Sequence, residues 1–145
     1  MKAVVQRVIN AEVKVEGKIT GKIDRGLLIF LGVGPEDTEK NADELIKKIC
    51  NLRIFRDEED KMNLSVKDIN GEILVVSQFT LYADCKKGNR PSFIGAASPE
   101  KAEKLYEYFK EKCKIEVKNV QSGIFGADMK VGLINDGPVT IILER

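Results

Sequence analysis

The chain has 145 residues, a net charge of +1 from 24 basic and 23 acidic residues, and 43% apolar residues. This length suits one compact domain, so we expect a single domain over residues 1–145. The near-neutral charge argues against a protein that coats nucleic acid through phosphate neutralisation, so any nucleic-acid contact must be local, through a patch. No apolar run could span a bilayer, and the first residues alternate like a strand, so we expect a cytoplasmic protein without membrane contact.

The chain contains no histidine and has three cysteines, Cys50, Cys85 and Cys113. Acid–base catalysis by imidazole is therefore excluded. The cysteines are far apart, which indicates neither a zinc site nor a redox pair, and no carboxylate cluster has suitable spacing for a metal. We expect no metal and no cofactor. Cys50 and Cys113 are expected in the core, whereas Cys85 lies in a polar loop where a reactive role is the lesser alternative.

The first part of the chain predicts strands. Residues 3–8 and 11–15 alternate polar and apolar side chains, which predicts one strand or a kinked pair. A turn at residues 16–18 and a further alternating run over 19–23 predict a hairpin. Residues 26–33 form a continuous apolar run, which is typical of a strand covered on both faces.

The hydrophobic period then changes to that of a helix, which Asp37 or Thr38 would cap. Residues 52–55 predict a short strand, followed by an acidic turn at 57–60. That turn could bind a cation, but it lacks the ligand spacing of a calcium loop, and a solvated turn is the favoured interpretation. The helix would bury one face, formed by Ala42, Leu45, Ile46 and Ile49.

An Asn-Gly pair at residues 70–71 predicts a turn, and residues 72–80 predict a strand. Residues 83–97 form a long polar loop, and loops of this length in compact domains are often functional. A second helix is expected to begin after Ser98, with Pro99 in its first turn. Its buried face would consist of Ala102, Leu105, Tyr106, Phe109 and Cys113.

The remaining sequence predicts strands over residues 115–120, 123–127, 130–134 and 139–143. Two helices would thus accompany about eight or nine strands, which come in runs rather than in βαβ alternation. This order predicts a fold of the α+β or α/β type, in which antiparallel or mixed sheets form a barrel-like core with two flanking helices.

Two segments place polar or conformationally special residues inside predicted strands. In Ser77-Gln78-Phe79-Thr80-Leu81, backbone N–H groups at a strand end could stabilise an oxyanion, and the side chains of Gln78 and Thr80 could hold a hydroxyl or carbonyl. An ordinary edge strand is the alternative. In the segment 135–140, Gly137 before Pro138 would let a ligand approach the backbone closely. A plain trans turn is the alternative there, since cis bonds are only about 5–6% of X-Pro bonds.

Both segments, in their order and context, resemble the D-aminoacyl-tRNA deacylases of the D-tyrosyl-tRNA deacylase family. The resemblance covers the whole chain, and no position of the family's motifs departs from the pattern. The matching segments are MKAVVQRV (1–8), GLLIFLGV (26–33), RIF (53–55), SQFTL (77–81), GNRPSF (88–93), GIFGADM (123–129) and NDGPVT (135–140).

The resemblance implies a homodimer in which a cis Gly137-Pro138 pair enters the partner's active site. The carbonyls of both residues would meet the substrate's α-amino group, and an L side chain would collide with this element, so that only D substrates are accepted. Glycyl-tRNA offers no side chain to reject and would also be cleaved. Arg7 would brace the Gly-Pro element, and Phe125 and Met129 would line a pocket for the terminal adenosine.

The resemblance also implies an ester hydrolase that needs no histidine, because a ribose hydroxyl of the substrate can orient or activate the attacking water. Ser77, Gln78, Phe79 and Thr80 would form the catalytic segment, with the N–H groups of Phe79 and Thr80 as oxyanion donors. Thr80 could instead be a nucleophile, but no histidine is available to activate it. We interpret Thr80 as a positioning residue.

Three cations in the polar loop, Lys86, Lys87 and Arg90, would contact phosphates of the tRNA acceptor end or remain solvated loop charges. The main alternative function is a non-catalytic DNA-binding protein, although the chain lacks a basic tail or recognition helix. A general small-molecule esterase would need a histidine triad or a metal. A purely structural dimer module would not explain two polar segments inside strands.

Overall fold

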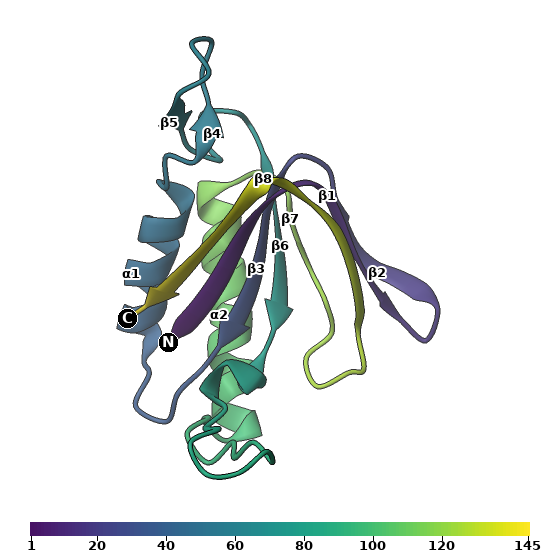
Figure 1. Ribbon diagram of the computed structural model, residues 1–145, viewed down its shortest axis with the longest axis vertical. Helices are drawn as coiled ribbons and strands as arrows, with labels where there is room; N and C mark the ends of the chain where they lie inside the picture. The colour runs from purple at the N-terminus through teal and green to yellow at the C-terminus, as the bar shows by residue number, and fades with distance from the viewer.

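The computed structural model describes residues 1–145 and contains eight strands, two α-helices and one 3₁₀ helix (Figure 1). This composition confirms the expected two helices among many short strands. The elements follow in the order β1 (Lys2–Val15), β2 (Lys18–Ile23), β3 (Gly26–Gly32), α1 (Glu39–Cys50), β4 (Phe55–Arg56), β5 (Met62–Leu64), β6 (Glu72–Ser77), η1 (Phe79–Tyr82), α2 (Pro99–Glu116), β7 (Val120–Ser122) and β8 (Lys130–Glu144).

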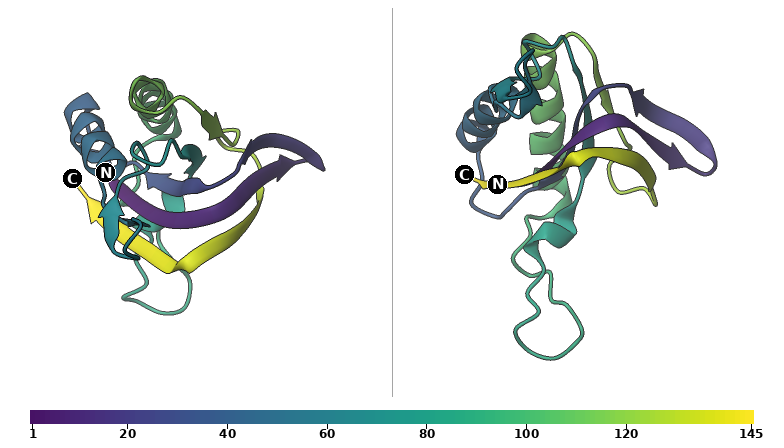
Figure 2. Two further views of the ribbon diagram at one scale, coloured as in Figure 1. Left: turned by 90° about the horizontal axis from the view of Figure 1, so that it is seen from above. Right: turned by 45° about the horizontal axis from the view of Figure 1, so that its top comes forward.

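Six strands form one mixed sheet, and β4 and β5 form a separate hairpin. β1 pairs antiparallel with β2, β3 and β8, whereas β3 pairs parallel with β6 and β6 parallel with β7. The first half of β1 lies beside β3 and its second half beside β2, so the sheet curls along β1 (Figure 2). β2 returns next to β7, and the sheet nearly closes into the predicted barrel-like core.

Both helices cover the same face of the sheet (Figure 2). α1 begins after Thr38, whose N–H and hydroxyl donate to Asn41 Oδ1 at 2.9 and 2.8 Å. α2 begins after Ser98, whose side chain accepts a hydrogen bond from the Lys101 N–H. Neither helix combines the length and the apolar composition that a membrane crossing requires. The predicted buried faces are confirmed at Ala42, Leu45, Ile46, Ile49, Ala102, Leu105, Tyr106, Phe109 and Cys113.

β3 is buried on both faces, as its continuous apolar run predicts. Leu27 and Ile29 belong to the larger core cluster beneath the helices, and Leu28 belongs to a smaller cluster on the opposite face, inside the curled sheet. Burying each such side chain contributes about 1.5–3 kcal/mol. Cys50 and Cys113 also lie in the larger cluster, which confirms their expected place in the core.

Several predicted element boundaries are wrong. α2 continues to Glu116, so the strand predicted over residues 115–120 shrinks to β7, and residues 123–127 form a turn. Residues 52–54 have no regular secondary structure, the Leu52 N–H donates back to Ile49 O at 3.1 Å, and only the end of the predicted strand pairs in β4. Short alternating runs fit the last turn of a helix as well as a strand, and tertiary packing decides between them.

The two last predicted strands are one strand, β8, which contains a cis Gly137-Pro138 bond. Gln6 pairs with Thr140 and Val8 pairs with Asn135, so residues 136–139 of β8 lie opposite Arg7 alone. The extra residues form a bulge. The bulge absorbs the Gly-Pro interruption without ending the strand, which is why the local sequence suggested two strands.

Candidate active site

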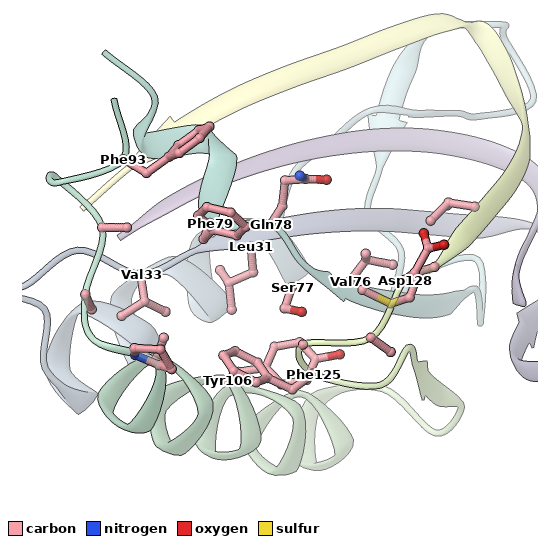
Figure 3. Close-up of a pocket in the computed structure, with 18 residues that line it drawn as sticks. Leu31, Val33, Val76, Ser77, Gln78, Phe79, Phe93, Tyr106, Phe125 and Asp128 are labelled. Atoms are coloured by element: carbon pink, nitrogen blue, oxygen red, sulfur yellow. The ribbon is translucent and has the colours of Figure 1, made fainter. Parts of the chain in front are cut away.

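A pocket of about 550 Å³ opens where the parallel strands β3 and β6 end (Figure 3). The register places Leu31 of β3 beside Ser77 of β6, so both strands finish at one edge of the sheet. This volume lies within the roughly 300–1,000 Å³ that small-molecule sites occupy. Most of the lining is apolar, and it consists of Leu31, Val33, Val76, Ser77, Gln78, Phe79, Phe93, Ala96, Ala97, Pro99, Ala102, Tyr106, Phe125, Gly126, Ala127, Asp128, Met129 and Val131.

The strand predicted over residues 72–80 ends at Ser77, and the chain turns into η1. The Gln78 N–H donates to Leu31 O at 2.8 Å, and the Leu81 N–H donates to Gln78 O at 3.2 Å. The N–H groups of Phe79 and Thr80 lie between these two bonds, at helix positions whose donors have no internal acceptor. Neither N–H therefore has an acceptor within the chain, and of these two residues Phe79 lines the pocket. Unpaired backbone donors are the kind of group that an oxyanion site uses.

The side chains of this segment contain no base. The Ser77 hydroxyl points into the pocket (Figure 3). The Gln78 amide donates a hydrogen bond to Thr80 Oγ1, and Thr80 itself does not line the pocket. An amide nitrogen that donates to a hydroxyl cannot also remove its proton, so this contact orients Thr80 and does not activate it.

Tyr82 fastens η1 to the rest of the fold. Its hydroxyl donates to Asp37 Oδ2 at 3.2 Å, and the same carboxylate accepts the Gly34 N–H at 2.6 Å and the ammonium of Met1. Burial, together with the Asp37 charge, raises the pKa of Tyr82. The phenol therefore stays protonated at neutral pH and remains a donor to Asp37.

Tyr106 and Phe125 form an aromatic wall of the pocket, with ring centroids 5.8 Å apart. The Tyr106 hydroxyl donates to Val75 O at 2.9 Å, and burial raises its pKa, so this group also stays neutral. Met129 packs close to Gly123, where an added Cβ would lie 2.3 Å from the methionine sulfur. The side chain of Met129 thus adds to the apolar lining, and the part of the pocket beside Phe125 and Met129 forms an apolar slot.

Arg7 and the Gly137-Pro138 pair lie away from this pocket. In the pairing of β1 with β3, Arg7 lies opposite Leu27, whereas Ala3 lies opposite Leu31. With a rise of about 3.3 Å per residue and about 4.8 Å between strands, the β8 bulge is roughly 20 Å from Ser77. Figure 1 shows the bend of β8 and η1 at opposite ends of the sheet. One chain therefore does not bring the two sequence-predicted segments together.

The side chain of Arg7 contacts the bulge of β8 through hydrogen bonds and an ion pair. Its side chain is only 3% exposed, its Nε donates to Asp136 O at 3.0 Å and lies 3.1 Å from Asp136 Oδ2, and its Nη1 donates to Ile54 O. Gly137 has a φ of +129°, and an added Cβ there would lie 2.7 Å from Arg7 Nη2. The guanidinium thus packs directly beneath the glycine and ties the bulge to the segment before β4.

Lys86, Lys87 and Arg90 are exposed in the polar loop, which projects from the end of the molecule that carries the pocket (Figure 2). Phe93 and Tyr106 line the pocket but are not among the site residues that the sequence predicts. Tyr106 fits the buried period of α2, so nothing separates it from ordinary core residues. Phe93 is the only aromatic residue of the loop over residues 83–97, and that signal could have identified it.

The fold is a curled mixed sheet with two helices, and an apolar site lies at the ends of its parallel strands. The family model of D-Tyr-tRNA(Tyr) deacylase matches residues 4–144. A D-aminoacyl-tRNA deacylase of Thermosipho melanesiensis is 62% identical over 145 residues, which cover 99% of this chain and 97% of that protein. The chain therefore belongs to the D-Tyr-tRNA(Tyr) deacylase family, as its sequence motifs predict.

Two solved structures are similar over nearly their whole length. A protein named c-Myc DNA Unwinding Element Binding Protein has a TM-score of 0.95 and 47% identity, with 100% of this chain and 99% of that chain covered. A probable eukaryotic D-amino acid tRNA deacylase has a TM-score of 0.85 and 16% identity, with 98% and 97% covered. The second likeness shows the shared fold, which confirms the predicted fold class.

Replacement of Arg7 by methionine should lower the free energy of unfolding by about 1–3 kcal/mol, because buried acceptors lose their donor. Urea denaturation monitored by circular dichroism measures the loss. Arg56→Met is the matched control, since Arg56 pairs with Asp60 at the surface and such pairs contribute at most about 1 kcal/mol. Equal stability of both variants would contradict a supporting role for Arg7.

Proposed function

We propose that this chain hydrolyses the ester of D-aminoacyl-tRNA, and of mischarged glycyl-tRNA, releasing tRNA and the free amino acid in the cytoplasm. Membership in the deacylase family supports an enzyme that hydrolyses carboxylic esters. The observation that carries the proposal is the pair of free N–H groups at Phe79 and Thr80, which begin η1 beside an apolar pocket. The whole chain would act as one domain.

The chemistry relies on the substrate for its proton acceptor. The chain has no imidazole, the buried phenol of Tyr106 stays neutral, and the carboxylate of Asp128 in the pocket lining is 85% exposed and paired with Lys130. A ribose hydroxyl beside the ester would orient or activate water, which attacks the carbonyl carbon. The two N–H groups of η1 would stabilise the oxyanion, and collapse of the tetrahedral intermediate would expel the ribose oxygen, which takes up the proton lost by the attacking water. The apolar slot beside Phe125 and Met129 would hold the terminal adenosine.

Selection against L substrates would require two copies of the chain. Gly137 and Pro138 are exposed on the β8 bulge, roughly 20 Å from the pocket of their own chain by strand geometry. In a homodimer, the bulge of one chain would enter the pocket of its partner, where the carbonyls of Gly137 and Pro138 meet the α-amino group. Backbone supported by Arg7 would leave no room for an L side chain.

The basic segment of the polar loop would contact the acceptor end of the tRNA. Lys86, Lys87 and Arg90 take part in no ion pair of the structure, so their charges are available to phosphates. The net charge of +1 agrees with a local contact of this kind. DNA binding is the alternative function, and the name of the 47% identical structure favours testing it. Duplex affinity that falls with salt, without ester cleavage, would support that alternative.

The decisive measurement compares release of radiolabelled tyrosine from D-tyrosyl-tRNA and L-tyrosyl-tRNA at equal enzyme and moderate salt. We expect fast release of D-tyrosine and retention of the L ester. A D ester whose terminal ribose lacks the neighbouring hydroxyl should be cleaved far more slowly. No release from either natural ester would exclude the proposed hydrolase, and equal release would retain a hydrolase but remove the chiral filter.

Thr80→Ala should reduce the rate of D-tyrosyl-tRNA hydrolysis by only about fivefold, the effect of losing one orienting hydrogen bond. Thr80→Ser keeps the hydroxyl and serves as the control. A loss of about 10⁴-fold or more in Thr80→Ala, with substrate affinity intact, would instead show that Thr80 is a nucleophile.

Gly137→Ala should weaken discrimination between D and L esters by about tenfold or more, since small misplacements of a positioning element have large kinetic effects. The added Cβ would collide with Arg7 and would require a φ of +129° that L residues rarely adopt. Gly132→Ala is the matched control on the same strand, where the Cβ makes only an ordinary 3.7 Å contact with Glu12. Unchanged selectivity in Gly137→Ala would argue against the filter.

A further inference from the structure

Two phenylalanine rings stand exposed at the mouth of the pocket. Phe79 of η1 is 56% exposed and Phe93 of the polar loop is 37% exposed. Their ring centroids lie 5.0 Å apart and their planes meet at 68°, an edge-to-face arrangement (Figure 3). Large aromatic side chains are ordinarily buried, and an exposed pair that lines a pocket indicates a surface that a ligand covers.

The loop that carries Phe93 is closed by its own hydrogen bonds. The N–H groups of Asp84 and Ser92 each donate to the carbonyl of the other, at 2.8 and 2.9 Å. The carboxylate of Asp84, the only acid of the loop, accepts the Lys86 N–H at 2.9 Å. The Ala97 N–H donates to Val33 O at 2.9 Å and anchors the end of the loop to the residue that follows β3. Phe93 therefore has a defined position beside the cations of the loop tip.

Charge and aromatic surface thus occur together on this loop. Lys86, Lys87 and Arg90 lie between the two paired residues that close it, and all three are exposed. Proteins that bind single-stranded nucleic acid combine a positively charged track with aromatic rings on which bases stack. An acidic or apolar protein partner would match either the cations or the rings, whereas an unpaired polynucleotide matches both.

We propose that Phe93, braced by Phe79, is a stacking platform for the base that precedes the terminal adenosine of a single-stranded RNA 3′ end. This proposal rests on the proposed function, in which Phe125 and Met129 hold that adenosine. Phe93 lies on the wall of the pocket away from Asp128 (Figure 3). The chain of nucleotides would leave the slot, pass Phe93 and continue along Lys86, Lys87 and Arg90. Unpaired bases are free to stack in this way, whereas bases in a duplex are not.

The test uses the full chain and an RNA hairpin that carries no amino acid. The hairpin has a single-stranded 3′ end and a fluorophore at its 5′ end. Fluorescence anisotropy gives the affinity for the intact hairpin and for a hairpin with an abasic ribose before the terminal adenosine. Phe93→Ala should weaken binding of the intact RNA by roughly 5- to 100-fold, the usual effect of losing one stacked base. The same variant should change affinity for the abasic RNA by less than about twofold, because the stacked base is already absent.

Two further variants separate stacking from a general effect on the loop. Phe93→Tyr keeps an aromatic ring and should restore affinity for the intact RNA. Ile94→Ala removes the adjacent side chain, which is 93% exposed, and should leave both affinities unchanged. If Phe93→Ala lost affinity equally for the intact and the abasic RNA, the proposed platform would be wrong. It would also be wrong if the unaltered protein did not bind the hairpin.

The binding test and the hydrolysis assay can fail separately. If the protein hydrolyses D-tyrosyl-tRNA but Phe93→Ala shows no dependence on the base, the platform is wrong and the activity stands. If the base dependence is found without any hydrolysis, the platform stands and the proposed activity is wrong. A higher affinity for a single-stranded oligonucleotide than for duplex RNA of equal charge would support stacking directly. Equal affinity for the two would contradict it.

Discussion

The parallel pairing of β3 with β6 is the contact on which the rest of the structure depends. β3 is buried on both faces, and a slip of its register would move apolar side chains out of both core clusters. The register places Leu31 beside Ser77, so both strands end together and the chain must leave the sheet there. The pocket and the free backbone donors of η1 follow from this edge, the usual place for ligands in parallel sheets.

The buried guanidinium of Arg7 imposes a second constraint. Removing this charge from water is costly, and the acceptors on Asp136 and Ile54 offset that cost. The same contacts hold the β8 bulge in place, so that residues 136–139 of an otherwise paired strand lie at the surface. Because the bulge and the pocket lie at opposite ends of the sheet, a site that uses both requires two chains.

The pocket combines aromatic surface with backbone donors and contains no imidazole. Tyr82 and Tyr106 are both kept neutral by burial, and each already donates its hydroxyl proton to a protein acceptor. Neither neutral phenol can act as a general base. The carboxylate of Asp128 also lines the pocket, but its side chain is 85% exposed and pairs with Lys130. In the proposed stacking platform, the exposed ring of Phe93 and the cations of the same loop would add binding surface for a polynucleotide without adding reactive groups.

The sequence by itself determined the buried faces of both helices, the two-sided burial of β3 and the exclusion of imidazole chemistry, because each depends on local periodicity or composition. It misjudged residues 115–120, where alternation fits a helix end and a strand equally well, and it divided β8 at Gly137-Pro138. Only the tertiary structure decided the course of β8, since its pairing with β1 joins residues more than a hundred positions apart. For the same reason, no local pattern could show that Arg7 and Ser77 lie at opposite ends of one sheet.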